Sequence, residues 1–260
     1  MTPAPTATYL YCAVQGANDP LRGGRHRPLR GLPGAGPLRA LDAGGGVWLV
    51  ASAAPLDQYG AEAIDARLAD LDWVSKCAVA HDAVVEHFAR THPVIPMKLF
   101  TLFTSEDRAR EHVSRARRKL GRLFARVADR QEWGVRMLLD ERRALPAAES
   151  PITAPTGRAF LQLKKAAKDA RQRVVADALT EADAVYAALD KAAEDSRRRT
   201  PSAEGPVSRM VLDAAFLVKR GEARRFKAAV AEAARSVAAR GLTLSLTGPW
   251  PPYHFVVDEP

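Results

Sequence analysis

The sequence predicts an α+β protein of two domains, and three observations lead to this fold class. Over the first 140 residues, short β-branched and aromatic runs alternate with longer segments of helical periodicity. A proline-rich stretch, residues 143–156, then interrupts the pattern. A second alternation follows, which a very long helical segment opens. We therefore expect an N-terminal domain over residues 1–142, a linker over 143–156, and a smaller, more helical C-terminal domain over 157–260.

The N-terminal domain is expected to begin with three strands. Thr8–Val14 is rich in β-branched and aromatic residues, as strands are. Residues 15–37 are rich in Gly, Pro and Arg and predict a long loop. Residues 37–42 and 47–53 flank three consecutive glycines, which predicts a β-hairpin. A phosphate-binding loop is the alternative for these glycines, but no P-loop or dinucleotide pattern accompanies them.

A long helix and a buried strand follow. Apolar residues at spacings of three and four predict one helix over Tyr59–Arg90, with Asp57 as its N-cap. The apolar run Pro93–Glu106 is too short for a core helix and predicts a strand that is buried on both faces. Lys98 lies in the middle of this run, where we expect it to pair with a carboxylate or to reach the sheet edge.

A basic helix and a last strand complete the predicted domain. Thr104 and Asp107 have a spacing like that of a capping box, which places the start of a helix over about Ser105–Asp129. Glu132–Asp140 then predicts a strand. The order of elements is close to that of a modified ferredoxin-like sandwich with a rearranged beginning.

The C-terminal domain is expected to be α-β-α-β. Its first helix has a stripe made largely of alanine, which allows another helix to approach closely. Thr180 is a candidate cap for a second helix if this segment breaks. The expected elements are a helix at Gly157–Ser196, a polar linker at 197–206, a strand at 207–219, a helix at 221–240, a strand at 242–246 and a stiff extended segment at 247–253.

Composition and cysteine usage exclude several classes of protein. The chain has 260 residues and a net charge of +9, which favours acidic partners, although a GC-rich genome gives the same bias towards arginine and alanine. Cys12 and Cys77 lie far apart, which argues against a zinc module or a disulfide scaffold. We expect a cytosolic protein because no secretory signal and no segment of roughly 18 apolar residues occurs.

No pattern of catalytic or metal-ligating residues stands out. Cys77 and His81 are four residues apart on one predicted helix, as a metal site or a nucleophile pair would require. Both fall on the apolar stripe, so packing in the core is the favoured interpretation. His87 and His92 could extend a cluster, but His87 falls on another face of the helix. We therefore expect no enzyme, no cofactor and no metal.

Protein binding and RNA binding are the two functions left to weigh. A basic ferredoxin-like RNA-binding module is the alternative, although the strand aromatics lie in runs predicted to be buried and no RNP-like motif occurs. Aromatic residues on the stiff C-terminal segment would either join the domains or form a binding edge. The candidate interface consists of Trp250, Tyr253 and Phe255 from that segment and of Arg115, Arg118 and Arg122 from the basic helix.

Seven blocks, in order along nearly the whole chain, resemble one known family. They are TYLYCAV at 8–14, the helix from Tyr59 to Glu86, PVIPMKLFTLFTSE at 93–106, EWGVRM at 132–137, GRAFLQLKK at 157–165, AAFLVKR at 214–220 and LTGPWPPYHFV at 246–256. On these residues the chain is similar to the gas vesicle protein family GvpF/GvpL. The loop before Pro37 and the linker 197–206 depart from the family pattern.

The resemblance implies a non-enzymatic accessory or minor structural protein of gas vesicles. Family members are two-domain α+β proteins with a modified ferredoxin-like N-terminal domain. They are implicated in shell assembly through contacts with the shell protein GvpA and with other accessory proteins, and a location on the gas-facing side of the shell has been proposed. We expect no small-molecule substrate, membrane or nucleic-acid partner. Our hypothesis is that the long helix 157–196 and the C-terminal aromatics form the binding surface.

Overall fold

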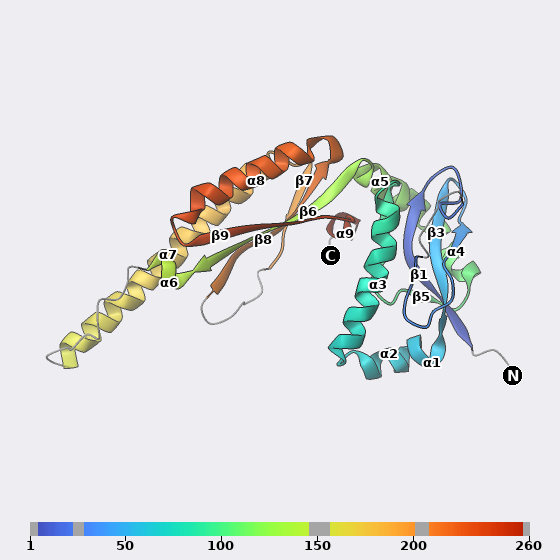
Figure 1. The fold of residues 1–260 in the computed structure, drawn as a ribbon, viewed down its shortest axis with the longest axis horizontal. Helices are drawn as coiled ribbons and strands as arrows, with labels where there is room; N and C mark the ends of the chain where they lie inside the picture. Colours follow the sequence, from blue (N-terminus) through green and yellow to red (C-terminus); the bar gives the residue numbers. More distant parts are fainter. Residues whose placement is uncertain (1–4, 23–28, 146–156, 201–207, 257–260) are drawn as a thin grey trace. The chain divides into compact units, whose positions relative to one another are not determined.

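The computed structural model describes residues 5–22, 29–145, 157–200 and 208–256 (Figure 1). Contacts divide the chain into two compact units, one made of residues 1–130 and 250–260 and the other of residues 131–249. Each unit has its own sheet, and helices pack on both sheets, so the predicted α+β class is confirmed. No helix in the described ranges is long and apolar enough to cross a membrane.

The sheet of the first unit is built around β1. Its strand order is β2-β3-β1-β4, and β5 also pairs with β1. The predicted hairpin is confirmed, since β2 and β3 pair antiparallel with Leu41 opposite Leu49. The strands are β1 (Thr6–Gln15), β2 (Arg39–Asp42), β3 (Val47–Pro55), β4 (Val94–Pro96) and β5 (Leu102–Phe103).

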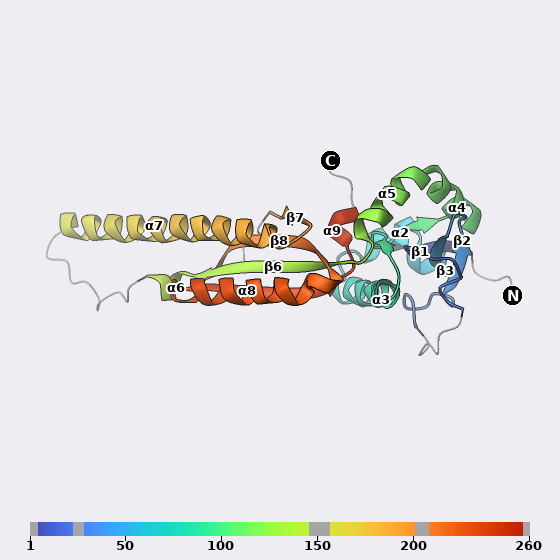
Figure 2. The same ribbon diagram turned by 90° about the horizontal axis from the view of Figure 1, so that it is seen from above.

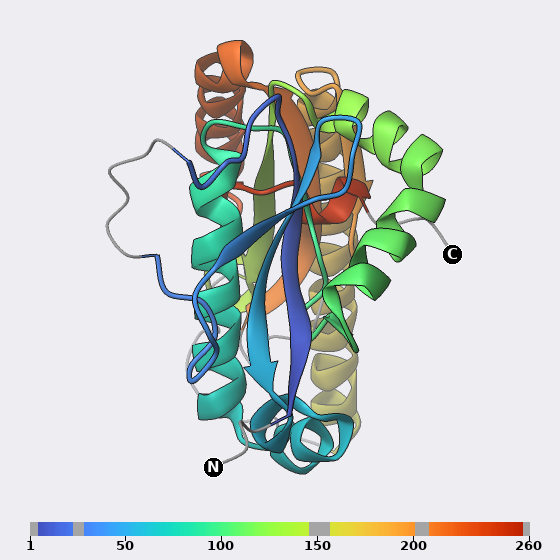
Figure 3. The same cartoon turned by 90° about the vertical axis from the view of Figure 1, so that its right-hand side faces the viewer.

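Helices cover both faces of this sheet, as Figure 3 shows. The pairing of β1 with β3 shifts by one residue between Leu10 and Cys12, which marks a β-bulge at Tyr11. Because of the bulge, Tyr11 and Cys12 both join the core beneath α3 (Leu71–Ala89), whereas Leu10 joins the core beneath α4 and α5. The first unit is thus a helix–sheet–helix sandwich.

The prediction of a single long helix over Tyr59–Arg90 is wrong. The segment forms α1 (Leu56–Tyr59), α2 (Ala61–Arg67) and α3. Gly60 is extended and ends the first of these helices. Asp70 then caps α3 by accepting a hydrogen bond from the Trp73 amide at 3.1 Å. The predicted cap, Asp57, lies instead in the first turn of α1, which starts after Pro55.

The strand predicted over Pro93–Glu106 is interrupted. Only β4 and β5 are strand, and Phe100 between them has φ +63°, which a continuous strand cannot accommodate. Val94 and Ile95 are buried as expected. Lys98 lies between the two strands and is exposed, so its charge needs no buried partner.

The basic helix also divides into two. Its parts are α4 (Glu106–Arg115) and α5 (Arg117–Val127), which meet at Ala116. Ser105, one residue after the predicted cap Thr104, accepts the capping hydrogen bond from the Arg108 amide at 3.2 Å.

The second unit has a ferredoxin-like topology. Its element order is β-α-β-β-α-β, and its strand order is β7-β8-β6-β9, the arrangement of a split βαβ motif. Short helices α6 and η1 are inserted. The elements are β6 (Arg130–Asp140), α6 (Glu141–Ala144), α7 (Gly157–Asp190), β7 (Asp195–Arg198), β8 (Ser208–Lys219), η1 (Arg220–Glu222), α8 (Ala223–Ala238) and β9 (Leu242–Trp250).

Helices α7 and α8 share one core with this sheet (Figures 1 and 2). The core takes alternate residues of β6, from Trp133 to Leu139, and the stripe Ala178, Ala182, Val185 and Leu189 of α7. Helix α7 is not broken at Thr180, because the Thr180 hydroxyl donates to the Ala176 carbonyl one turn earlier at 3.1 Å. The predicted long helix is therefore confirmed, and it ends at Asp190.

The contacts do not follow the expected boundary at 143–156. Strand β6, predicted to close the N-terminal domain, lies between β8 and β9 and so belongs to the second unit. The proline-rich residues fall between α6 and α7 of that same unit, and most of them, 146–156, lie outside the described residues. Of the predicted linker 197–206, the first residues form the end of β7, and 201–206 are likewise not described.

Candidate interaction surface

The C-terminal segment 250–256 is anchored on the first unit. It ends in a short helix, α9 (Tyr253–Val256), which packs near α5 and β4. The Tyr253 hydroxyl donates a hydrogen bond to Asp82 Oδ1 of α3 at 2.6 Å. Burial raises the pKa of Tyr253, and the carboxylate it contacts raises that pKa further. The hydroxyl therefore stays protonated and acts as a donor at neutral pH.

The two other aromatic residues predicted in this segment differ in exposure. Phe255 is fully buried, and the Arg126 guanidinium lies 5.8 Å from its ring centroid. Trp250 is 44% exposed. Of the three predicted aromatics, Trp250 is thus the one with a large exposed surface, while Tyr253 and Phe255 hold the segment in place.

The predicted arginines lie on two helices with different electrostatic surroundings. On α4, the arginines pair with carboxylates of the same helix, and Arg115 contacts Glu111. Helix α5 contains no acidic residue. Arg118 and Arg122 on this helix are exposed, and within the described ranges neither forms an ion pair. Of the predicted arginines, Arg115 is therefore neutralised within its own helix, whereas Arg118 and Arg122 have no ion-pair partner among the described residues.

Helix α7 carries an exposed apolar cluster that the sequence pattern did not distinguish from core. Phe160, Leu161 and Leu163 are 47%, 67% and 40% exposed. Figures 1 and 2 show this part of α7 continuing past the ends of β6, β9 and α8. Three large apolar side chains within one turn form an exposed apolar patch.

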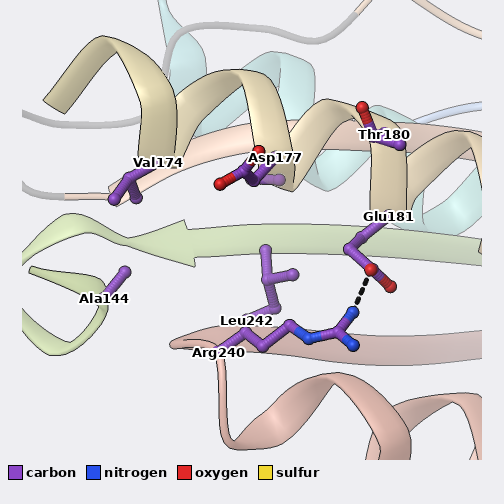
Figure 4. A pocket seen from close by; sticks show the side chains of 8 residues that line it. Ala144, Val174, Asp177, Thr180, Glu181, Arg240 and Leu242 are labelled. Carbon is purple, nitrogen blue, oxygen red and sulfur yellow. Dashed lines mark ion pairs between the residues drawn. The ribbon is translucent and has the colours of Figure 1, made fainter. Parts of the chain in front are cut away.

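A pocket of about 400 Å³ lies beside the middle of α7 (Figure 4). Arg240 forms an ion pair with Glu181 at its edge, and Asp177 adds a second carboxylate. Apolar residues of α6, α7 and β9 complete the lining. The Thr180 hydroxyl is used by its own helix, so the pocket offers no nucleophile activated by a base.

Cys77 and His81 are core residues, which confirms the packing interpretation. His81 is 2% exposed and both of its ring nitrogens have partners, the Tyr9 hydroxyl at 2.7 Å from Nδ1 and the Met97 carbonyl at 3.1 Å from Nε2. Since Nε2 must donate to that carbonyl, Nδ1 accepts from the tyrosine. Burial lowers the pKa of His81 and raises the pKa of Cys77. Across the described part of the chain, no three potential ligands gather as a metal site requires.

Comparison with known proteins gives a family match over nearly the whole chain. The model of the family described as gas vesicle synthesis protein GvpL/GvpF matches residues 7–257. The chain is 30% identical over 257 residues to gas vesicle protein L of Streptomyces sp. (strain CB03234), covering 95% of this chain and 91% of that protein.

Solved structures show the same fold at low sequence identity. The crystal structure of gas vesicle protein GvpF from Anabaena sp. PCC7120 superposes with a TM-score of 0.71 at 15% identity, covering 98% of this chain and 97% of that one. GvpF from Microcystis aeruginosa gives a TM-score of 0.65 at 14% identity, covering 96% and 99%. The fold agrees with the match in sequence, and the chain belongs to the gas vesicle GvpL/GvpF family.

Proposed function

We propose that this protein is an accessory protein that assists gas vesicle assembly by binding the shell protein GvpA and other accessory proteins. Family membership supports the link to gas vesicles. The proposed binding role is supported by two exposed features of the first unit. There Trp250 is exposed on an anchored segment, and the same unit presents the acid-free helix α5.

Such a surface suits a chaperone-like role. Shell subunits are apolar and aggregate unless their apolar surface is covered before the shell closes. An exposed indole on an anchored backbone loses little conformational entropy on binding. Unpaired cations raise the rate of encounter with an acidic partner. We place the protein at the gas vesicle, on the gas-facing side of the shell, as part of the same proposal.

Co-purification with GvpA and vesicle formation test this function together. We expect deletion of the gene in a vesicle-forming host to abolish or reduce vesicles, and the wild-type chain to retain GvpA in a pull-down. Trp250→Ala combined with Arg118→Glu and Arg122→Glu should weaken retention at least tenfold. Arg224→Glu on α8, an equally exposed helical arginine, is the matched control and should retain GvpA.

Two results would contradict the proposal. The first is normal vesicles after deletion, together with no GvpA in the pull-down. The second is binding of oligonucleotides that weakens steeply with salt and depends on Arg118 and Arg122, which would favour the RNA-binding alternative.

A further inference from the structure

The N-terminal part of α7, residues 158–171, is a free-standing stretch of helix. Helix α7 packs on β8 and α8 through its second half, from Val174 to Leu189. Of the eleven residues from 158 to 168, all are exposed except Ala159, which is half-buried. We name residues 158–171 the α7 arm. At about 1.5 Å per residue it is roughly 20 Å long.

The buried face of α7 continues in register onto the arm. Eighteen residues make about five turns of 3.6, so residues eighteen apart lie on the same side of a helix. Phe160 is thereby aligned with buried Ala178, and Ala167 with buried Val185. In the described part of the second unit, this helix face is thus covered by the sheet in one half and largely exposed in the other.

Cations replace apolar residues at alternate positions of that face. Lys164 is aligned with buried Ala182, and Arg171 with buried Leu189. From Arg158 to Arg173 the chain carries six cations and one carboxylate, Asp169. The arm therefore interleaves apolar and positively charged contacts along one line.

Arg171, at the inner end of the arm, forms an ion pair with a carboxylate of the same chain. Its guanidinium pairs with Glu141 of α6, a carboxylate that is itself buried. Lys168 lies about one turn further out than Arg171, and Lys164 about two turns. Neither lysine has an ion-pair partner among the residues that the structure describes. Lys164 instead lies over the Phe160 ring, 5.0 Å from its centroid. Among the described residues, Lys164 and Lys168 thus lack the carboxylate partner that Arg171 has in Glu141.

We propose that the α7 arm docks an amphipathic helix of another protein, one whose apolar stripe is flanked by Asp or Glu. The anchors Phe160, Leu163, Lys164 and Ala167 have the spacing by which helices recognise helices. This inference rests on the proposed role in binding gas vesicle proteins and specifies the chemistry of the partner segment.

Charge decides between this occupant and the others. A second copy of the chain would bring a second cationic arm against the first, so like charges would repel. A membrane surface requires apolar and cationic faces to be segregated, whereas Lys164 and Arg171 lie inside the apolar line. Nucleic acid offers phosphates to the lysines and bases that stack on Phe160, but little apolar surface to Leu161 and Leu163. An acidic amphipathic helix satisfies both kinds of contact.

Designed peptides test the inference on the purified full chain. One probe is a synthetic helix of about five turns with a Leu/Ala stripe flanked by Glu, and its twin has Lys in place of Glu. We expect fluorescence anisotropy to show binding of the Glu peptide and not of the Lys peptide. Phe160→Ser with Leu163→Ser should weaken binding at least tenfold. Lys164→Glu with Lys168→Glu should abolish the preference for the Glu peptide, because it lowers the net charge of residues 158–173 from +5 to +1.

The matched control is Gln162→Ser, an exposed position on the opposite side of the same turn. It should bind the Glu peptide like the wild type, and circular dichroism should show equal helix content in all variants. The inference fails if the Glu peptide does not bind, or if charge reversal leaves the preference unchanged. It also fails if anionic vesicles, RNA or a second copy of the chain occupies the arm and displaces the peptide.

GvpA pull-downs on the same variants separate this inference from the proposed function. If the wild type and the Phe160→Ser/Leu163→Ser variant retain GvpA equally and neither binds the Glu peptide, the proposed function stands and the inference is overturned. If no chain retains GvpA while the arm binds the Glu peptide with the expected preference, the inference stands and GvpA is not the partner.

Discussion

The Tyr253 hydroxyl donates a 2.6 Å hydrogen bond to the Asp82 carboxylate, joining residues that are 171 positions apart in the chain. The bond ties the C-terminal segment to α3. We expect Tyr253→Phe to lower the free energy of unfolding of the first unit by about 1 kcal/mol, since one partner is charged but exposed. Urea unfolding measures the change. In a double-mutant cycle with Asp82→Ala, a coupling below about 0.3 kcal/mol would contradict it.

Truncation of Phe255 should lower the free energy of unfolding more than truncation of Trp250. Phe255→Ala leaves a cavity in the core of the first unit and should cost about 3–5 kcal/mol. Trp250→Ala removes a ring that is 44% exposed and outside the buried core clusters, and it should cost clearly less than Phe255→Ala. Guanidinium unfolding of both variants decides the matter. Equal losses would show that the exposures of the two rings are not those described.

Acid should destabilise the first unit through His81. Burial lowers the pKa of His81 in the folded state, although the Asp82 charge and the bond to Met97 offset part of this effect. Below pH 6.5, the ordinary pKa of histidine, His81 binds a proton in the unfolded chain but not in the folded chain. The free energy of unfolding therefore decreases as the pH is lowered. Hydrogen exchange of β1 amides should accelerate as pH drops from 6.5 towards the lower folded pKa, after correction for intrinsic rates.

The control for this prediction is His81→Gln. It should be less stable at pH 7.5, because the Tyr9 bond is altered, but its stability should depend less on pH between 7.5 and 5. An identical pH dependence in both proteins would exclude His81 as the cause.

Alkaline pH should destabilise the same unit through its tyrosines. Burial raises the pKa values of Tyr9, Tyr11, Tyr59 and Tyr253 above the ordinary 10.0. Above pH 10 the unfolded chain releases protons that the folded chain keeps, so stability falls as pH rises. The slope is up to about 1.4 kcal/mol per pH unit for each tyrosine that stays protonated. In Tyr253→Phe the slope between pH 10 and 11 should be shallower, and an unchanged slope would contradict this assignment.

Local periodicity was enough to predict most of the strands and helix α7, because side-chain alternation and the 3.6-residue repeat are properties of a single segment, but β7 (Asp195–Arg198) was missed. Periodicity also failed at Phe100. The Phe100 amide donates to the Tyr9 hydroxyl at 3.3 Å and its ring stacks on Trp73 at 5.3 Å, so its left-handed backbone is fixed by distant residues. No repeat within Pro93–Glu106 carries that information.

The candidate surface could be predicted only in part, because local sequence signals mark aromatic residues but do not show which of them are buried. Aromatics on a proline-rich segment indicated a special role, and Trp250 is exposed. Burial of Phe255 depends on α5 and β4, more than a hundred residues earlier, so its environment could not be read from its neighbours. On α7 the apolar repeat predicted a packing face, but only the extent of the sheet decides which half of that face is covered.

The first unit takes in residues from both ends of the chain, and this has a consequence for its biosynthesis. When the ribosome has made residue 130, the segment that supplies Phe255 and Tyr253 does not yet exist. At about 5–20 residues per second, roughly ten seconds pass while the second unit is translated. The second unit can therefore fold on the nascent chain, whereas the first becomes complete only after residues 250–256 have left the ribosome, and until then the site that receives Phe255 is not filled.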